Sequence, residues 1–156
     1  MATEKQYAFF QSLYAEESQR ATLLADHAKN NLGLATLYSA FILFVVEKPG
    51  PSVTIYSKWI FIAAVICMLG AFLLSLWATQ ISTYEAITEP ADVLESYKDN
   101  PPTDDEFFDD RIADYTVACE KNSLVNDRKA NQLLVARYFL LAGITLHAIY
   151  FIVRFR

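Results

Sequence analysis

The sequence predicts an all-α membrane protein with three transmembrane helices, of which the first and third extend into the cytosol as long helices and form a helical cytoplasmic domain. Hydrophobic residues make up 54% of the 156 residues and charged residues only 20%. The apolar residues are concentrated in a few runs, whereas 13 of the 18 acidic residues fall between positions 85 and 127. Uncharged apolar runs approaching 20 residues are typical of membrane spans.

The second predicted span is the clearest, because residues 59–84 contain no charge. Trp59 and Trp77 lie 18 positions apart in this run. At about 1.5 Å per residue their separation is roughly 27 Å, close to the thickness of the hydrocarbon core. Tryptophans at both ends of a span are typical of interfacial anchoring. A buried core helix would instead need a large soluble domain around it, which we do not expect from this sequence.

The first predicted span is shorter, since its strongly apolar part covers only residues 34–46. Such a stretch alone is also compatible with an interfacial or re-entrant helix. Pro49, Gly50 and Pro51 follow it, and these turn residues favour a reversal of the chain. A membrane hairpin with the second span is therefore the simplest interpretation.

The third predicted span carries two ionisable side chains, Arg137 near one end and His147 inside. Arg137 is placed where a long side chain can reach the headgroups. A histidine at membrane depth is a functional-site candidate, because burying it costs free energy unless it has a partner or water. Tyr150, one turn away, is a candidate partner.

Helix start signals extend the outer spans toward the cytosol. Thr3 with Gln6, and Thr103 with Glu106, each match a capping box. The predicted order is a cytoplasmic amphipathic helix (1–31), a first span (32–47), a short external loop (48–57), a second span (58–80), an acidic cytoplasmic loop and helix (81–132), a third span (133–153) and an external C-terminus (154–156).

The distribution of lysine and arginine favours a cytoplasmic N-terminus. Seven basic residues near the membrane fall on the N-terminal side: Arg20, Lys29, Lys98, Lys121, Arg128, Lys129 and Arg137. Four fall on the other side: Lys48, Lys58, Arg154 and Arg156. The positive-inside rule then predicts a multi-pass protein with its long loop in the cytoplasm.

The sequence offers no support for an enzyme or a cofactor. Only four glycines occur, and none forms a phosphate-binding loop. The acidic run at residues 104–110 lacks the alternating acids and central glycine of a calcium-binding loop, so an acidic helix start is the better interpretation. A net charge of −5 also argues against binding duplex DNA.

Small and polar residues at helical spacing indicate packing faces in the spans. One stripe on the second span comprises Ala64, Cys67, Ala71, Ser75, Ala78 and Ser82. A comparable one on the third, interrupted by Leu140, comprises Ala136, Gly143, His147, Tyr150 and Arg154. The plain interpretation is packing inside one protomer; the functional one is a conduit formed by several protomers. Its pore or gate candidates are His147, Ser75, Thr145, Gly143, Thr36 and Ser39.

Five basic residues lie close to the predicted membrane surface: Arg20, Lys29, Lys121, Arg128 and Lys129. Contact with anionic lipid headgroups is the simpler interpretation. In an oligomer the same side chains would recur around a ring, where they become candidates for binding a phosphate-bearing signal.

The layout resembles that of the SLATT-type small membrane effectors of bacterial anti-phage defence, as in CBASS-like and Hailong-like systems. Residues 23–46, residues 59–79 and the Asn122-x3-Asn126-x2-Lys129-Ala130 stretch carry the resemblance. It implies a homo-oligomeric ion channel in the bacterial inner membrane, gated by a nucleotide or oligonucleotide from a partner nucleotidyltransferase. Opening would depolarise the membrane and arrest growth. The third span departs from the simplest two-helix pattern of these effectors.

Two other functions remain open from sequence. The stronger is a non-conducting membrane scaffold or anchor that recruits a soluble partner through residues 85–130. A small transporter is a weaker alternative, because His147 is the one ionisable residue deep in a span and broken helices of the transporter kind are not evident.

Overall fold

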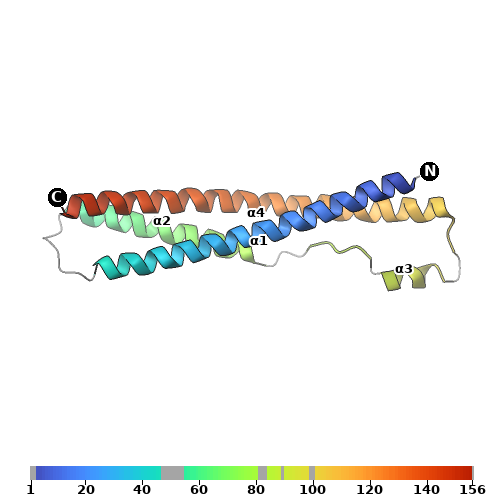
Figure 1. The fold of residues 1–156 in the computed structure, drawn as a ribbon, viewed down its shortest axis with the longest axis horizontal. Helices are drawn as coiled ribbons and strands as arrows, with labels where there is room; N and C mark the ends of the chain where they lie inside the picture. The colour runs from blue at the N-terminus through green and yellow to red at the C-terminus, as the bar shows by residue number, and fades with distance from the viewer. Residues whose placement is uncertain (1–2, 47–54, 81–83, 89, 99–100, 156) are drawn as a thin grey trace. The chain divides into compact units, whose positions relative to one another are not determined.

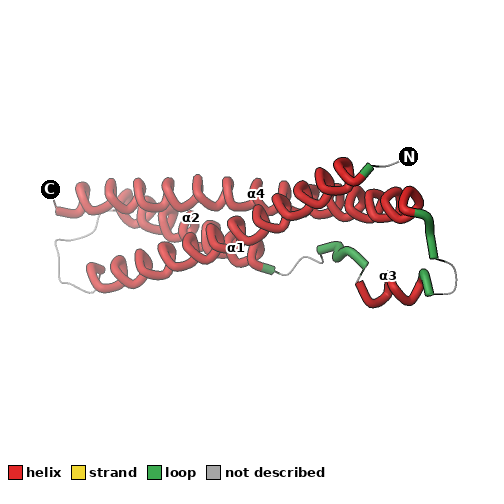
Figure 2. Tube along the Cα trace, turned by 45° about the vertical axis from the view of Figure 1, so that its right-hand side comes forward, coloured by secondary structure: helices red, strands yellow, loops and turns green. Residues whose placement is uncertain are grey.

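The computed structural model describes residues 3–46, 55–80, 84–88, 90–98 and 101–155, and this part of the chain is helical with no strand (Figure 2). Its helices are α1 (Glu4–Val46), α2 (Ile55–Thr79), α3 (Pro90–Ser96) and α4 (Asp104–Phe155). By length and composition, α2 and α4 can each cross a membrane; within the described residues α1 is not among the helices that meet this criterion. The predicted all-α class and the long first and last helices are confirmed.

Both predicted capping boxes form. The Thr3 amide donates to Gln6 Oε1 at 2.9 Å, and the Thr103 amide donates to Glu106 Oε2 at 2.9 Å. In return the amides of Gln6 and Glu106 each donate to the threonine hydroxyl at 3.4 Å. These bonds satisfy amides that the first turn of a helix leaves without partners, and so they set where α1 and α4 begin.

The helix boundaries differ from prediction by a few residues. Helix α2 begins at Ile55, inside the predicted loop 48–57, and α4 continues past residue 153 to Phe155. Helix α3, which was not predicted, begins at Pro90 and has Asp92 in its first turn, both typical of a helix start. Residues 48–54 of the predicted loop, Ser82 of the small-residue stripe and Arg156 lie outside the described residues.

The chain divides into two compact units. Unit 1 comprises residues 1–23 and 81–128, and unit 2 comprises residues 24–80 and 129–156. In unit 1 the start of α1 packs against the start of α4 through aromatic rings. Tyr115, which is buried, lies edge-on to Tyr7 and Tyr14, with ring centroids 5.7 and 5.8 Å apart. Burial raises the pKa of Tyr115 to about 12, so it stays neutral and packs as an apolar ring.

Two asparagines of α4 fix the segment that follows α2 and the facing part of α1. The Asn122 side chain accepts from the Glu85 amide at 2.9 Å and donates to the Glu85 carbonyl at 3.1 Å. Asn126 accepts from the Tyr84 hydroxyl at 2.9 Å and donates to the carbonyl and the carboxylate of Glu17 at 3.0 and 2.7 Å. Both side chains are buried, and these bonds offset the cost of burying the amides.

In unit 2, α2 lies beside the last part of α4 (Figure 1), and small residues let the helices approach closely. Gly143 of α4 faces α2, where an added Cβ would lie 2.8 Å from Met68 Sδ and 3.3 Å from the Ala64 carbonyl oxygen. Two small cores result. One consists of Ala35, Met68, Ala71 and Leu140, and the other of Ala28, Ala78 and Leu133.

Candidate functional site

The exposure pattern of unit 2 reverses that of a water-soluble bundle. Its outer surface carries large apolar side chains, including Leu37, Leu43, Trp59, Trp77 and Tyr138, which are 60–73% exposed. Its interior combines small and apolar residues with a few polar side chains: Asn31, Ser57, Ser75 and His147 are each at most 8% exposed. A large exposed apolar surface marks contact with lipid or with another protein.

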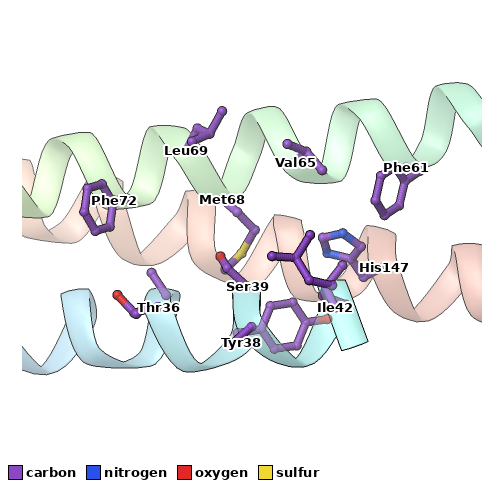
Figure 3. A pocket seen from close by; sticks show the side chains of 13 residues that line it. Thr36, Tyr38, Ser39, Ile42, Phe61, Val65, Met68, Leu69, Phe72 and His147 are labelled. Atoms are coloured by element: carbon purple, nitrogen blue, oxygen red, sulfur yellow. The ribbon is translucent and has the colours of Figure 1, made fainter. Parts of the chain in front are cut away.

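A groove in unit 2 runs between α1 and α2, with α4 behind it (Figure 3). It has a volume of about 510 Å³. Its walls are mainly apolar, and they comprise Ala35, Thr36, Tyr38, Ser39, Ala40, Ile42 and Leu43 of α1, Phe61, Val65, Met68, Leu69 and Phe72 of α2, and His147 of α4. The polar groups in the lining are therefore few.

His147 is the most distinctive group in the groove. It is 1% exposed, and among the described residues neither ring nitrogen makes a hydrogen bond of full geometry, although the backbone of Gly143, one turn earlier, interacts with the imidazole. The rings of Tyr38 and Phe61 lie on either side, each with its centroid 5.5 Å from that of the imidazole. Tyr150 does not pair with His147 as the sequence suggested; its hydroxyl instead accepts a hydrogen bond from Arg154 at 2.9 Å.

Thr36 and Ser39 lie on the α1 wall of the same groove (Figure 3). Both are exposed, and the Thr36 hydroxyl donates to the Leu32 carbonyl at 2.8 Å, a bond that meets its donor requirement within the helix. Three of the six pore candidates, His147, Thr36 and Ser39, are thus brought together.

The other three pore candidates lie elsewhere. Ser75 is 1% exposed on α2, its hydroxyl has no partner among the described residues, and it does not line the groove. Gly143 is packed against Met68. Thr145 is exposed on α4, where its hydroxyl donates to the Leu141 carbonyl at 2.9 Å. A conduit between protomers needs groups on the protomer surface, which Ser75 and Gly143 do not provide.

The basic candidates in unit 1 are mostly neutralised by acids. Arg20 pairs with Asp127 and with Glu17, and the hydrogen bond to Asp127 raises the pKa of the guanidinium. Lys121 pairs with Glu85 at 2.9 Å. Arg128 is exposed and makes no ion pair within the described part of the chain, so it is the most available of the three for an anion.

In unit 2, Lys29 pairs with Asp26 of its own helix at 3.5 Å, and both side chains are exposed. Lys129 is buried, at 9% exposure. Exposed ion pairs of this kind contribute little to stability, so Lys29 can exchange Asp26 for another anion. Lys129 is poorly placed to meet a ligand from solvent.

Sequence reasoning did not identify the groove or its aromatic residues. Tyr38 and Phe61 come from helices far apart in sequence, and no local spacing reveals that they flank His147. Asn122 and Asn126 did carry a local signal, because a spacing of four places both amides on one face of a helix.

Over the described residues, fold and site together define an all-helical protein with two helices apolar enough to cross a membrane and a groove whose lining includes a buried imidazole. No family model matches the chain, and neither the curated proteins nor the solved structures contain a match.

Proposed function

We propose that unit 2 is embedded in the bilayer, with α2, the last part of α4 and the apolar end of α1 as its three spans. The large apolar side chains outside unit 2 and the small and polar ones buried within it support this, because lipid favours apolar side chains outward and small or polar residues hold membrane helices together. The end of α1 lines the groove together with α2, which places it beside a helix apolar enough to span. The excess of basic residues on one side orients the N-terminus toward the cytoplasm.

The function that the geometry favours is a homo-oligomeric ion channel. The observation that carries it is the groove, where Thr36 and Ser39 expose hydroxyls above His147 on an otherwise apolar surface. The two exposed hydroxyls offer an ion or its water the hydrogen bonds that lipid cannot, while the buried His147 lies behind them in the wall of the groove. A ring of protomers with these grooves turned inward would enclose a path lined by such groups.

The proposed setting is bacterial anti-phage defence in the inner membrane. Unit 1 would receive a nucleotide or short oligonucleotide signal from a partner nucleotidyltransferase, with Arg128 as first contact and with Arg20 and Lys121 exchanging their acids for phosphate. Helices α1 and α4 contribute residues to both units, so binding in unit 1 acts on helices that also line the groove. Control requires that the signal bind the open and closed states with different affinity.

Ion flux from liposomes tests the channel and its lining. Purified protein should release a trapped potassium gradient, and Ser39→Leu and His147→Leu should each reduce the rate at equal protein content. Thr145→Leu leaves the groove unchanged. It should therefore leave the flux rate unchanged if the groove lines the conduit, and should lower the rate if the exposed face of α4 lines it. Absence of flux from the wild-type protein, with and without candidate nucleotides, would reject the channel.

A non-conducting scaffold is the second candidate, and unit 1 carries the observation that favours it. Phe9, Leu94, Val117 and Leu124 are 48–74% exposed there, and apolar side chains at a surface are typical of partner contacts. A scaffold predicts that Leu124→Glu abolishes the cellular effect while Ser39→Leu and His147→Leu are tolerated. A channel predicts that Ser39→Leu and His147→Leu abolish it.

A further inference from the structure

One end of the apolar surface of unit 2 is marked by a cation on each of two helices. Lys29 is the last charged residue of α1 before residues 30–46, and Arg137 holds the same place on α4 before residues 138–153. Neither of these stretches contains a lysine, arginine, aspartate or glutamate. Both cations are exposed, so the charged surface of each helix ends at these residues.

The two cations lie close to one level of the helix bundle. Ala28, next to Lys29 in the chain, is buried in a core with Ala78 of α2 and Leu133 of α4. Arg137 follows Leu133 by about one turn, and long side chains on a helix lean toward the N-terminal end of that helix. The guanidinium group is therefore carried back toward the level of Leu133, where the charged surface of α1 also ends.

Helix α2 contributes an indole at the same level. Trp77 precedes Ala78 of this core and is 60% exposed. Indole and basic side chains at one level are typical of the boundary between hydrocarbon and headgroups, because the indole ring is apolar and its N–H is polar. Trp59 lies about 27 Å away along α2, close to the thickness of the hydrocarbon core. Three helices thus mark one boundary of the proposed bilayer.

At this boundary Arg137 is the basic side chain most available to a lipid. Lys129 is buried, and Lys29 shares its charge with Asp26 at 3.5 Å. Arg137 makes no ion pair within the described part of the chain. A guanidinium group can donate two parallel hydrogen bonds to one phosphate, so Arg137 combines the exposure and the chemistry that phosphate binding requires.

We propose that Arg137 binds the phosphate of an anionic phospholipid, with Lys29 adding positive charge and Trp77 packing at the same depth. The ligand is a lipid of the bilayer and not a free phosphate, because the surface that follows Arg137 is apolar. Tyr138 and Leu141 are 64% and 61% exposed there, where the acyl chains of the bound lipid would cover them. The proposal rests on the proposed embedding of unit 2 in a bilayer and does not depend on ion conduction.

The test compares an anionic with a zwitterionic lipid at the protein surface. Full-length protein is reconstituted in phosphatidylcholine vesicles with a trace of spin-labelled phosphatidylglycerol or spin-labelled phosphatidylcholine. Electron paramagnetic resonance separates lipid held at the protein surface from lipid in the bulk bilayer. The wild-type protein should hold phosphatidylglycerol more strongly than phosphatidylcholine. This preference should fall as salt is raised, because salt screens exposed charges.

Variants assign the preference to Arg137. Arg137→Gln should lower the relative association constant for phosphatidylglycerol about two- to fivefold, the effect of one basic residue near a charged membrane surface. Arg137→Lys keeps the charge and should retain most of the preference. Lys29→Gln should have a smaller effect, because Lys29 already pairs with Asp26. Lys5→Gln is the matched control, since Lys5 is an exposed lysine of α1 in unit 1, and should change nothing.

Three results would overturn the proposal while leaving the embedding of unit 2 intact. The first is equal association of the two lipids with the wild-type protein. The second is an equal loss in Arg137→Gln and Lys5→Gln, which would assign the preference to net charge alone. The third is displacement of phosphatidylglycerol by inorganic phosphate beyond the effect of sodium chloride at equal ionic strength, which would indicate a site for free phosphate. Absence of surface-held lipid with either label would overturn the embedding itself.

Discussion

At the scale of single residues, the two largest fully buried side chains among the described residues differ in how well their polar atoms are hydrogen-bonded. Asn126 of unit 1 uses its amide on Tyr84 and Glu17. His147 of unit 2 has no partner on either nitrogen within the described residues. A satisfied buried group stabilises the fold, whereas a poorly satisfied one costs free energy, so the two side chains contribute to stability in opposite directions.

This contrast predicts opposite effects of removing the two groups. Asn126→Leu leaves the Tyr84 hydroxyl and the Glu17 groups without their partner, and should lower the free energy of unfolding by about 2–3 kcal/mol. His147→Phe removes a desolvated imidazole while keeping an aromatic ring, and should leave stability unchanged or raised. Thermal unfolding in detergent measures both. A large loss of stability in His147→Phe would show that its nitrogens are paired in the native protein.

His147, Thr36 and Ser39 could be identified from sequence, because polar side chains in apolar runs stand out by composition alone. Their neighbours Tyr38 and Phe61 could not, since aromatic residues are ordinary in membrane spans and only the packing of three helices brings them to the imidazole. Ser75 and Gly143 were candidates because they belong to stripes of small and polar residues. The packing of the helices, which sequence does not reveal, leaves both out of the groove lining.

At the scale of helices, glycine decides how closely α2 and α4 approach. An added Cβ at Gly143 would lie under 3.0 Å from Met68 Cγ and Sδ, whereas one at Gly33 of α1 meets nothing within 4 Å. Both positions are helical, and alanine is about 1 kcal/mol more favourable than glycine in a helix.

Replacing each of the two glycines with alanine should therefore change the free energy of unfolding in opposite directions. Gly33→Ala should raise the free energy of unfolding by about 0.5–1 kcal/mol. Gly143→Ala should lower it by about 1–3 kcal/mol, because overpacking outweighs the gain in helix propensity. Thermal unfolding of the two variants under one detergent condition makes the comparison. Equal stabilisation by both would show that α2 and α4 do not pack through Gly143.

The stability of the cap at the start of α4 should depend on pH, whereas the equivalent cap of α1 should not. Hydrogen bonds from the backbone and hydroxyl of Thr103 lower the pKa of Glu106. A lowered pKa in the folded state means that the stabilising contribution is present above the unfolded-state pKa and is lost as pH falls through the folded-state pKa. Gln6, the equivalent residue of the α1 cap, does not titrate.

Hydrogen exchange of the amides in the first turn measures the stability of this cap. Protection at the start of α4 should fall as pH is lowered into the acid range, while protection at the start of α1 changes less. Glu106→Gln should make the α4 cap resemble the Thr3–Gln6 cap and remove most of the pH dependence. An equal fall of protection in wild type and Glu106→Gln would assign the effect to other acids of the first turn.

Sequence predicted the long helices well because their signals are local. Capping boxes, an uncharged run and turn residues each act over a few positions. Helix α3 was missed because seven residues are too few to show periodicity. The predicted first span is the least determined part, because its apolar stretch is short and interrupted by Thr36 and Ser39, and α1 is not among the helices apolar enough to span.

At the scale of the whole molecule, an acidic unit 1 and an apolar unit 2 share two continuous helices. The helices of unit 2 pack their own interior, as the buried Ala64, Ala71 and Ala136 demonstrate, so the proposed ion path requires several copies. The mass in detergent, after subtraction of bound detergent, should be a multiple of 17.7 kDa. A monomer under conditions that preserve the fold would remove the route for ions.

Single-channel recording in planar lipid bilayers tests the central claim most directly. Wild-type protein should give discrete current steps, and Ser39→Leu should lower their amplitude because it replaces a hydroxyl of the proposed lining with an apolar side chain. The same number of inserted oligomers must be compared in each case. Correctly inserted wild-type oligomers that pass no current, with or without candidate nucleotide signals, would contradict the channel.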